Sequence, residues 1–360
     1  MRRLSIGILA FLALAIVAAI ALFRFPPLQD RLVEGVVERA LAQTSAELFA
    51  ENALRVLICG SSSPMPHPNR AKPCTAVFAG GRFWVVDTGP GSWNRLAMWR
   101  IPGRHIGAVL LTHFHSDHIG ELGEFDLQTW IDGRGAPLQV FGPEGVERVV
   151  AGFEEAYALD AGYRTLHHGA DLLPPDIGRM QARTISFPTQ GPQRAVIFDA
   201  DGLRITAFAV DHRPVEPAVG YRFDYRGRSA VVSGDTVPYP GLVAAAQGAD
   251  LLVHEAQANH MVAVIGAVAA TAGRPRTAKI MSDIPEYHTT PVQAAEVANE
   301  AGVRMLVLTH LTPPPPNSVA ASVFVRGVSE VRPNGWFLAD DGHLIELPLD
   351  SDEINIRKMP

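Results

Sequence analysis

The sequence predicts an α/β fold built from two β-rich halves with helices on their outer sides. Short apolar runs rich in Val, Ile and Leu recur from residue 55 onward and have the length and composition of buried strands. Ala-rich segments with helical spacing alternate with the later runs. No Gly/Ser linker, charge block or internal repeat divides the chain after residue 54, so residues 54–360 are expected to form one large domain.

Residues 1–25 are the first predicted element, a signal anchor or a signal peptide. Two arginines precede an uncharged stretch over residues 4–23, which is long enough to span a bilayer. Positive charge ahead of the stretch predicts a cytoplasmic start, so residues 4–23 are expected to anchor a periplasmic or extracytoplasmic domain to the inner membrane. Cleavage at Ala19-Ile20-Ala21 is the alternative.

Residues 26–53 are predicted to form an amphipathic stalk helix. Apolar residues such as Leu28, Leu32 and Val36 follow helical spacing, with charged residues such as Asp30 between them. The apolar face of this helix is expected to lie on a membrane surface or to dock onto the domain that follows.

Strands are expected at the apolar runs of the large domain. They cover residues 55–59, 75–79, 83–86, 107–111, 203–210, 218–223, 229–233, 251–253 and 305–308. A helix is expected over residues 291–301, because Thr290 and Pro291 are typical of a helix start and Gly302 of a helix end. Cys59 and Cys74, the only cysteines, lie near the end of the first strand and the start of the second. They would bridge in an oxidising compartment or remain two buried thiols.

A metal-binding motif directly follows one of the expected strands. Residues 112–120 read T-H-F-H-S-D-H-I-G and place His113, His115, Asp117 and His118 within six positions. Side chains two positions apart in an extended turn share a face. The first two histidines are therefore expected to bind one ion, while the aspartate and the third histidine reach toward a second.

Three further residues of metal-ligand type follow expected strands. His212, Asp235 and His310 each come one to three positions after an apolar run. A strand end is where a side chain leaves the core for a cleft, so we expect these three residues to converge on the histidine motif.

Together these motifs resemble the metallo-β-lactamase superfamily, in the branch that contains ribonuclease Z and arylsulfatase-like enzymes. The resemblance rests on the order H-x-H-x-D-H, a histidine before Gly-Tyr-Arg, S-G-D-T, H-E-A, H-T-T and L-T-H. It covers about residues 54–345 and includes the loop over residues 60–70. It implies an αββα sandwich of two mixed β-sheets flanked by helices, with two zinc ions (Zn²⁺) as cofactors.

The resemblance also implies a role for each site residue. One zinc ion would be held by His113, His115 and His212, the other by Asp117, His118 and His310, and Asp235 would bridge them. A metal-bridged hydroxide would be the nucleophile, with Asp117 helping to orient it. His288, in the sequence Y-H-T-T, would protonate the leaving group, and Glu255 would orient His288.

The interval between His212 and Asp235 distinguishes this chain from the tRNA-processing enzymes of that branch. It spans only 23 positions, whereas those enzymes generally carry here a long insertion that grips tRNA. The formal net charge of −6, from 31 basic and 37 acidic residues, offers little long-range attraction to a polyanion. Nucleic acid is therefore not expected as a partner, and a small-molecule ester is expected as the substrate.

These observations predict an exported zinc-dependent hydrolase that cleaves phosphodiester or aryl sulfate esters. Hydrolysis of a lactone or β-lactam ring is the alternative reaction, and a non-catalytic binding module on the same fold is the alternative from another class. A homodimer is a further expectation. The segment over residues 257–286 contains an apolar helix at residues 261–272, which is expected to form a lid over the cleft.

Overall fold

The computed structural model describes residues 2–42 and 45–360 of the chain. It divides into two compact units, Met1–Ser45 and Ala46–Pro360. Residues 43–44, which belong to the predicted stalk, lie outside the described residues.

The first unit contains two helices, α1 (Arg2–Arg24) and α2 (Pro26–Ala42). Within the described residues, no single helix is long and apolar enough to cross a membrane. A pair of segments, Phe11–Arg24 and Pro26–Arg39, meets the length and composition requirement jointly, with a bend of 81° between them. Membrane anchoring therefore stays a prediction.

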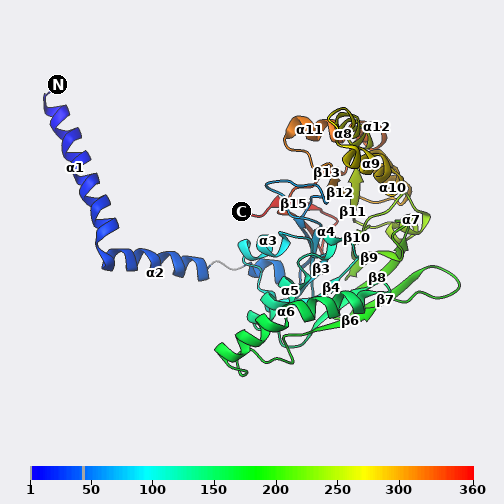
Figure 1. Ribbon diagram of the computed structural model, residues 1–360, viewed down its shortest axis with the longest axis horizontal. Helices are drawn as coiled ribbons and strands as arrows, with labels where there is room; N and C mark the ends of the chain where they lie inside the picture. The colour runs from blue at the N-terminus through cyan, green and yellow to red at the C-terminus, as the bar shows by residue number, and fades with distance from the viewer. Residues whose placement is uncertain (1, 43–44) are drawn as a thin grey trace. The chain divides into compact units, whose positions relative to one another are not determined.

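Two mixed β-sheets form the centre of the second unit (Figure 1). The first sheet has eight strands in the order β15-β14-β1-β2-β3-β4-β5-β6, antiparallel from β15 to β3 and parallel from β3 to β6. Its strands are β1 (Ala53–Gly60), β2 (Cys74–Ala79), β3 (Arg82–Val86), β4 (Ile106–Leu110), β5 (Leu138–Gly142), β6 (Met180–Thr184), β14 (His343–Pro348) and β15 (Asn355–Lys358).

The second sheet has seven strands in the order β13-β12-β11-β10-β9-β8-β7. It is parallel from β13 to β10 and antiparallel from β10 to β7. Its strands are β7 (Arg194–Ala200), β8 (Leu203–Val210), β9 (Ala218–Tyr225), β10 (Arg228–Val232), β11 (Leu251–Gln257), β12 (Met305–Thr312) and β13 (Trp336–Leu338).

The sheets pack face to face, and helices cover their outer faces. Val56 and Trp84 of the first sheet and Tyr221 and Val253 of the second share one buried cluster. Two other clusters lie under the helices on either side. The helices are α3 (Ser92–Met98), α4 (Ser116–Ile119), α5 (Leu122–Ile131), α6 (Val146–His168), α7 (Pro240–Ala246), α8 (Asn259–Thr271), α9 (Pro275–Asp283), α10 (Pro291–Glu300), α11 (Ser318–Phe324) and α12 (Val328–Val331). Single 3₁₀ turns occur at η1 (Ala46–Phe49), η2 (Gly103–His105) and η3 (Ile284–Glu286). The predicted sandwich of two mixed sheets flanked by helices is confirmed.

The expected elements correspond closely to nine strands and to helix α10. Thr290 caps α10 in a capping box with Gln293, which explains why the helix starts where the sequence predicts. Six strands were not expected: β5, β6, β7, β13, β14 and β15. Several of them, such as β6 and β7, are partly exposed, and half-exposed strands do not read as continuous apolar runs.

Cys59 and Cys74 form a disulfide. The bond joins the end of β1 to the start of β2 and closes the loop over residues 60–73. The sequence left the pairing open because it gives no distance between the two residues.

Candidate metal centre

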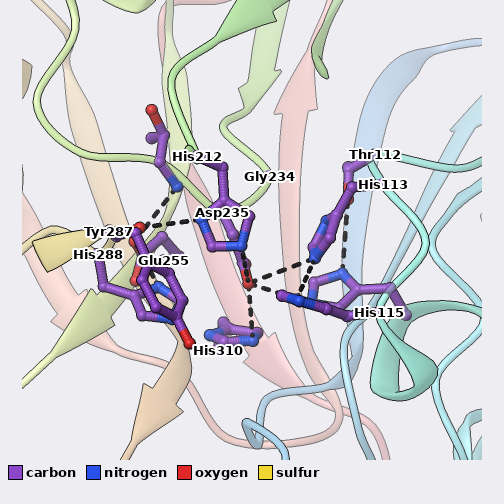
Figure 2. Close-up of polar contacts among 12 residues, drawn as sticks. Thr112, His113, His115, His212, Gly234, Asp235, Glu255, Tyr287, His288 and His310 are labelled. Atoms are coloured by element: carbon purple, nitrogen blue, oxygen red, sulfur yellow. Dashed lines mark hydrogen bonds and ion pairs between the residues drawn. The ribbon is translucent and has the colours of Figure 1, made fainter. Parts of the chain in front are cut away.

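The seven predicted metal ligands come from helix α4 and from four strands of the two sheets, β4, β8, β10 and β12, or the residues that follow them. His113 and His115 follow β4, Asp117 and His118 lie in α4, His212 follows β8, Asp235 follows β10, and His310 lies in β12. Figure 2 shows the imidazoles of His113, His115, His212 and His310 around the carboxylate of Asp235. Three strand ends, one short helix and a bulge in β12 thus converge to assemble the centre.

His310 occupies a bulge inside β12 rather than a position beyond the end of the strand. The register with β11 shifts here, because Glu255 pairs with Thr309 and Ala256 with Leu311, which leaves His310 unpaired. Its φ of 47° is a left-handed conformation that costs a non-glycine residue free energy. Bulges of this kind commonly re-aim a side chain next to a functional site.

Asp235 lies at the middle of the centre. Its Oδ2 is 3.3 Å from Nε2 of His118, 3.3 Å from Nε2 of His310, 3.8 Å from Nε2 of His113 and 3.9 Å from Nε2 of His212. One carboxylate oxygen therefore faces four imidazole nitrogens that belong to both halves of the predicted centre.

Three groups of donor atoms could hold a metal ion: two contain the seven predicted ligands, and a third combines Asp235, His288 and His310. In the first, donor atoms of His113, His115, His212 and Asp235 lie within 4.8 Å of one another, and in the second, those of Asp117, His118 and His310 do so. Oδ2 of Asp117 and Nε2 of His118, His212 and His310 are buried and have no hydrogen-bond partner among the described residues. Buried polar atoms without partners are costly, and a bound cation removes that cost.

Burial and neighbouring charges shift the pKa values of the residues in the centre in different directions. Burial lowers the pKa of His113 and of His212, so both imidazoles are held neutral. The imidazoles around Asp235 outweigh its burial and hold the pKa of its carboxyl well below the usual range. For His118, burial is outweighed by the nearby carboxylates, Asp235 first, which raise its pKa well above the usual value. A cation would supply the positive charge that these carboxylates attract.

Hydrogen bonds outside the centre fix the orientation of three imidazoles. Nδ1 of His118 lies 2.8 Å from Oδ2 of Asp87. Nδ1 of His113 lies 3.1 Å from Oγ1 of Thr112. Nδ1 of His212 lies 2.9 Å from the backbone oxygen of Tyr287. Each contact leaves Nε2 to face the centre, which is the usual arrangement for a metal-binding histidine.

The sequence does not single out Asp87, Thr112 or Tyr287. Thr112 donates hydrogen bonds to Asp87 through its backbone nitrogen, at 2.8 Å, and through its hydroxyl. The signal for Asp87 was present, since an aspartate directly after the apolar strand β3 sits at another strand end. Asp87 also has a φ of 62°, which marks a constrained position.

His288 and Glu255 lie together beside the predicted ligands. Nδ1 of His288 is 3.1 Å from Oε1 of Glu255, and the same oxygen accepts a hydrogen bond from the backbone of Thr289 at 2.8 Å. The rings of His288 and His212 have centroids 5.2 Å apart. Burial of His288 is outweighed by the charge of Glu255, so the pKa of the imidazole is raised.

The segment that was expected to cover the cleft forms helix α8. Val264 and Val268 of this helix are 62% and 60% exposed. These two side chains face solvent rather than the metal centre, while Val262 on the other side of the helix is buried.

Comparison with known families decides the classification. Residues 82–311 match the model of the beta-lactamase superfamily domain. The chain belongs to the metallo-β-lactamase superfamily. Among curated metallo-β-lactamase relatives, ribonuclease Z of Mycobacterium avium (strain 104) is 40% identical over 263 residues, which cover 72% of this chain and 86% of the relative. Ribonuclease Z of Mycobacterium sp. (strain KMS) is 36% identical over 296 residues, which cover 82% of this chain and 96% of the relative.

Solved metallo-β-lactamase structures share the fold. The short form of human tRNase Z superimposes with a TM-score of 0.58 at 21% identity, covering 82% of this chain and 99% of that one. A metallo-β-lactamase fold protein of Bacillus subtilis gives a TM-score of 0.57 at 19% identity, with coverage of 82% and 100%. At these identities the likeness concerns the fold alone.

Family and relatives establish the class of enzyme. The chain is a metal-dependent hydrolase that acts on ester bonds, as the sequence predicts. The prediction of a small-molecule ester substrate, with nucleic acid not expected as a partner, is wrong, because curated relatives at 36–40% identity are ribonucleases. Net charge sums over the whole surface, whereas phosphate groups are bound locally, so an acidic chain does not exclude an RNA substrate. The short interval between His212 and Asp235 means that this chain lacks an insertion at that place, whereas the residues of the predicted metal centre are all present.

Proposed function

We propose that this chain hydrolyses phosphodiester bonds in RNA at a dinuclear zinc centre. The position of Asp235 carries the proposal, because its Oδ2 lies 3.3–3.9 Å from imidazole nitrogens of both donor groups, as a ligand shared by two ions must. The names of the relatives support RNA as the substrate.

Two zinc ions would divide the seven side chains between them. The first would be held by His113, His115 and His212 and the second by Asp117, His118 and His310, with Asp235 between them. Neutral imidazoles and carboxylates are ordinary zinc ligands. When bound, the ions would acidify a water molecule and polarise a phosphate oxygen of the substrate.

Asp117 is suited to a second task besides metal binding. Its side chain is buried, and its Oδ2 lies 3.5 Å from Nε2 of His118 and 3.4 Å from Nε2 of His310. We propose that Asp117 also accepts a hydrogen bond from the attacking water and so orients it toward phosphorus.

His288 is the proposed proton donor to the leaving oxygen. A protonated imidazole beside the centre supplies the proton that an alkoxide leaving group needs. Glu255 fixes the ring through Nδ1 and raises the pKa of His288, so the imidazole keeps its proton nearer to neutral pH. Nε2 is then the nitrogen that donates.

The proposal is tested with the full chain loaded with zinc. We expect an end-labelled RNA oligonucleotide to be cleaved, and a nitrophenyl sulfate, a lactone and a β-lactam to remain intact. Intact RNA together with turnover of any of the other three substrates would assign the centre to a different ester or ring.

The Asp235→Ala variant distinguishes RNA cleavage by this centre from cleavage by a contaminating nuclease. Loss of the shared ligand is expected to lower RNA cleavage by about 10³-fold or more and to reduce bound zinc below two ions per chain. The matched control is Asp171→Ala, an exposed residue near the end of α6, which should keep full activity. A variant at position 235 with two zinc ions and full rate would overturn the proposal.

We also propose that the large unit lies outside the cytoplasm. The uncharged stretch over residues 4–23 and the Cys59–Cys74 disulfide support this location, because disulfides persist in oxidising compartments. A C-terminal fusion to a phosphatase that is active only outside the cytoplasm should be active. An inactive fusion together with reduced cysteines in cells would contradict it.

A further inference from the structure

Tyr287 stands at the metal centre without a role in the chemistry described above. It follows the turn η3 and directly precedes His288. Its side chain is partly buried, whereas its neighbour Glu286 is exposed. Figure 2 shows the phenol ring beside His288, with the hydroxyl on the side of the cluster where His310 lies.

The ring of Tyr287 is held in place by two histidines of the centre. Its centroid lies 4.9 Å from the ring of His212 at an interplanar angle of 69°, and 4.8 Å from the ring of His288 at 41°. The backbone oxygen of Tyr287 accepts the hydrogen bond from Nδ1 of His212. Movement of this residue would therefore disturb His212, and the phenol is preorganised relative to the centre.

The hydroxyl of Tyr287 has no hydrogen-bond partner among the residues that the structure describes. Tyr221 and Tyr157 use their hydroxyls within the protein, donating to the backbone oxygen of Leu111 at 2.6 Å and to Glu124 at 3.2 Å. The hydroxyl of Tyr225 also lacks a partner, but that side chain is fully buried in the core between the two sheets, where no ligand reaches it. The Tyr287 hydroxyl is not among the buried polar atoms without a partner, so it can donate to water or to a bound ligand. A donor that is fixed in place and left without a partner beside a reaction centre is suited to a ligand.

We propose that the Tyr287 hydroxyl donates a hydrogen bond to a non-bridging oxygen of the phosphate that is cleaved. This inference rests on the proposed phosphodiester chemistry. The oxygens of a phosphoryl group carry negative charge that is redistributed in the transition state, and a fixed donor there stabilises it. A neutral phenol supplies a hydrogen bond without another cation beside the imidazoles.

The decisive variant is Tyr287→Phe, because it removes the hydroxyl and keeps the ring and the backbone oxygen. For the zinc-loaded full chain, kcat on bis(4-nitrophenyl) phosphate is expected to fall by roughly 10²-fold, with KM changing less, as for the loss of one oxyanion donor. Zinc content should stay equal to that of the wild type, since His212 keeps its anchor. A loss of zinc would make Tyr287 a structural residue and would overturn the proposal.

A binding experiment keeps this inference separate from the proposed function. Orthovanadate mimics five-coordinate phosphorus, and calorimetry should show about 10-fold weaker binding to the Phe variant. If the wild type cleaves no diester but vanadate binding still depends on the hydroxyl, the phosphate contact stands and the proposed function fails. If the wild type cleaves diesters and the Phe variant matches it in kcat and vanadate affinity, the inference on Tyr287 fails alone.

Tyr163→Phe is the matched control. It removes the same hydroxyl from a side chain of α6 that is 64% exposed. Both kcat and vanadate affinity should equal those of the wild type. A comparable loss in this control would mean that the effect at position 287 does not report on substrate contact, and the proposal would fall.

Discussion

The carboxylate of Asp87 lies 2.8 Å from Nδ1 of His118, and both side chains are buried. This contact fixes the ring of His118 and turns Nε2 toward Asp235, at 3.3 Å. Because Thr112 donates to the same carboxylate, the orientation of one predicted ligand depends on two residues that bind no ion themselves.

Asp87→Asn should therefore weaken binding of the proposed second zinc ion more than binding of the proposed first. An amide has one acceptor oxygen instead of a charged carboxylate, so it holds the ring less firmly and makes the imidazole a poorer donor. Loss of such outer contacts typically costs about 10- to 100-fold in metal affinity. Competition titration with a zinc chelator measures the effect. Asp132→Asn, a surface residue paired with Arg104, is the control, and equal affinities for all three proteins would refute the prediction.

The sequence predicts most of the residues in this centre because their chemical types are rare at such positions. His113 and His115 stand in a dense motif after an apolar strand, and Asp235 and His310 follow the same rule in other strands. Convergence of those strand ends requires the second sheet to pack on the first, which the alternation of strands and helices already indicates.

The parts that the sequence does not reveal depend on common residue types or on spatial contacts. Thr112 and Tyr287 act through hydrogen bonds to histidines that are 1 and 75 positions away, and neither type signals a site by itself. The bulge at His310 is a register shift between two strands, which no local pattern encodes. Net charge predicts the wrong substrate class because it describes the whole chain rather than its active site.

His288→Ala should slow substrates with poor leaving groups far more than substrates with good ones. A general acid typically accelerates a reaction about 10²- to 10⁴-fold. A nitrophenolate leaves without a proton, so its departure gains little from a general acid. Cleavage rates of an RNA linkage and of a nitrophenyl phosphodiester, measured on the same zinc-loaded variant, give the comparison. Glu255→Gln should show the same pattern with a smaller loss, since Glu255 acts through His288. Equal slowing of both substrates would remove His288 from the donor role.

Replacement of the disulfide by two serines should destabilise the large unit without changing the metal ligands. Cys59 and Cys74 are 15 residues apart, and a cross-link that closes a loop of that size contributes about 3 kcal/mol in the chain-entropy model. Denaturant unfolding of Cys59→Ser/Cys74→Ser against the oxidised wild type measures the difference in unfolding free energy. Treatment of the wild type with a reductant should reproduce the loss. An unchanged midpoint in both cases would show that the bond does not limit stability.

Glu346→Gln should lower the free energy of unfolding at neutral pH. In acid the variant and the wild type should be about equally stable. Oε1 of Glu346 accepts a hydrogen bond from Nε of the buried Arg55 at 2.7 Å. Burial of Glu346 is outweighed by its contacts with Arg55 and Arg357, so the pKa of its carboxyl lies below the usual value of 4.5 for a glutamate. A lowered pKa in the folded state means that the carboxylate stabilises the fold above about pH 4.5, and that this contribution fades as the pH falls through the folded value.

We expect the variant to lose about 1 kcal/mol of unfolding free energy at pH 7, a modest figure because Glu346 is partly exposed. The difference from the wild type should shrink steadily below pH 4.5. Chelator present in every sample keeps metal loss from contributing to the slope. Glu330→Gln, an exposed residue without an ion pair among the described residues, should show no such pH dependence. A difference between wild type and Glu346→Gln that stays constant from pH 7 to pH 3 would mean that packing, rather than the charge of Glu346, explains the loss.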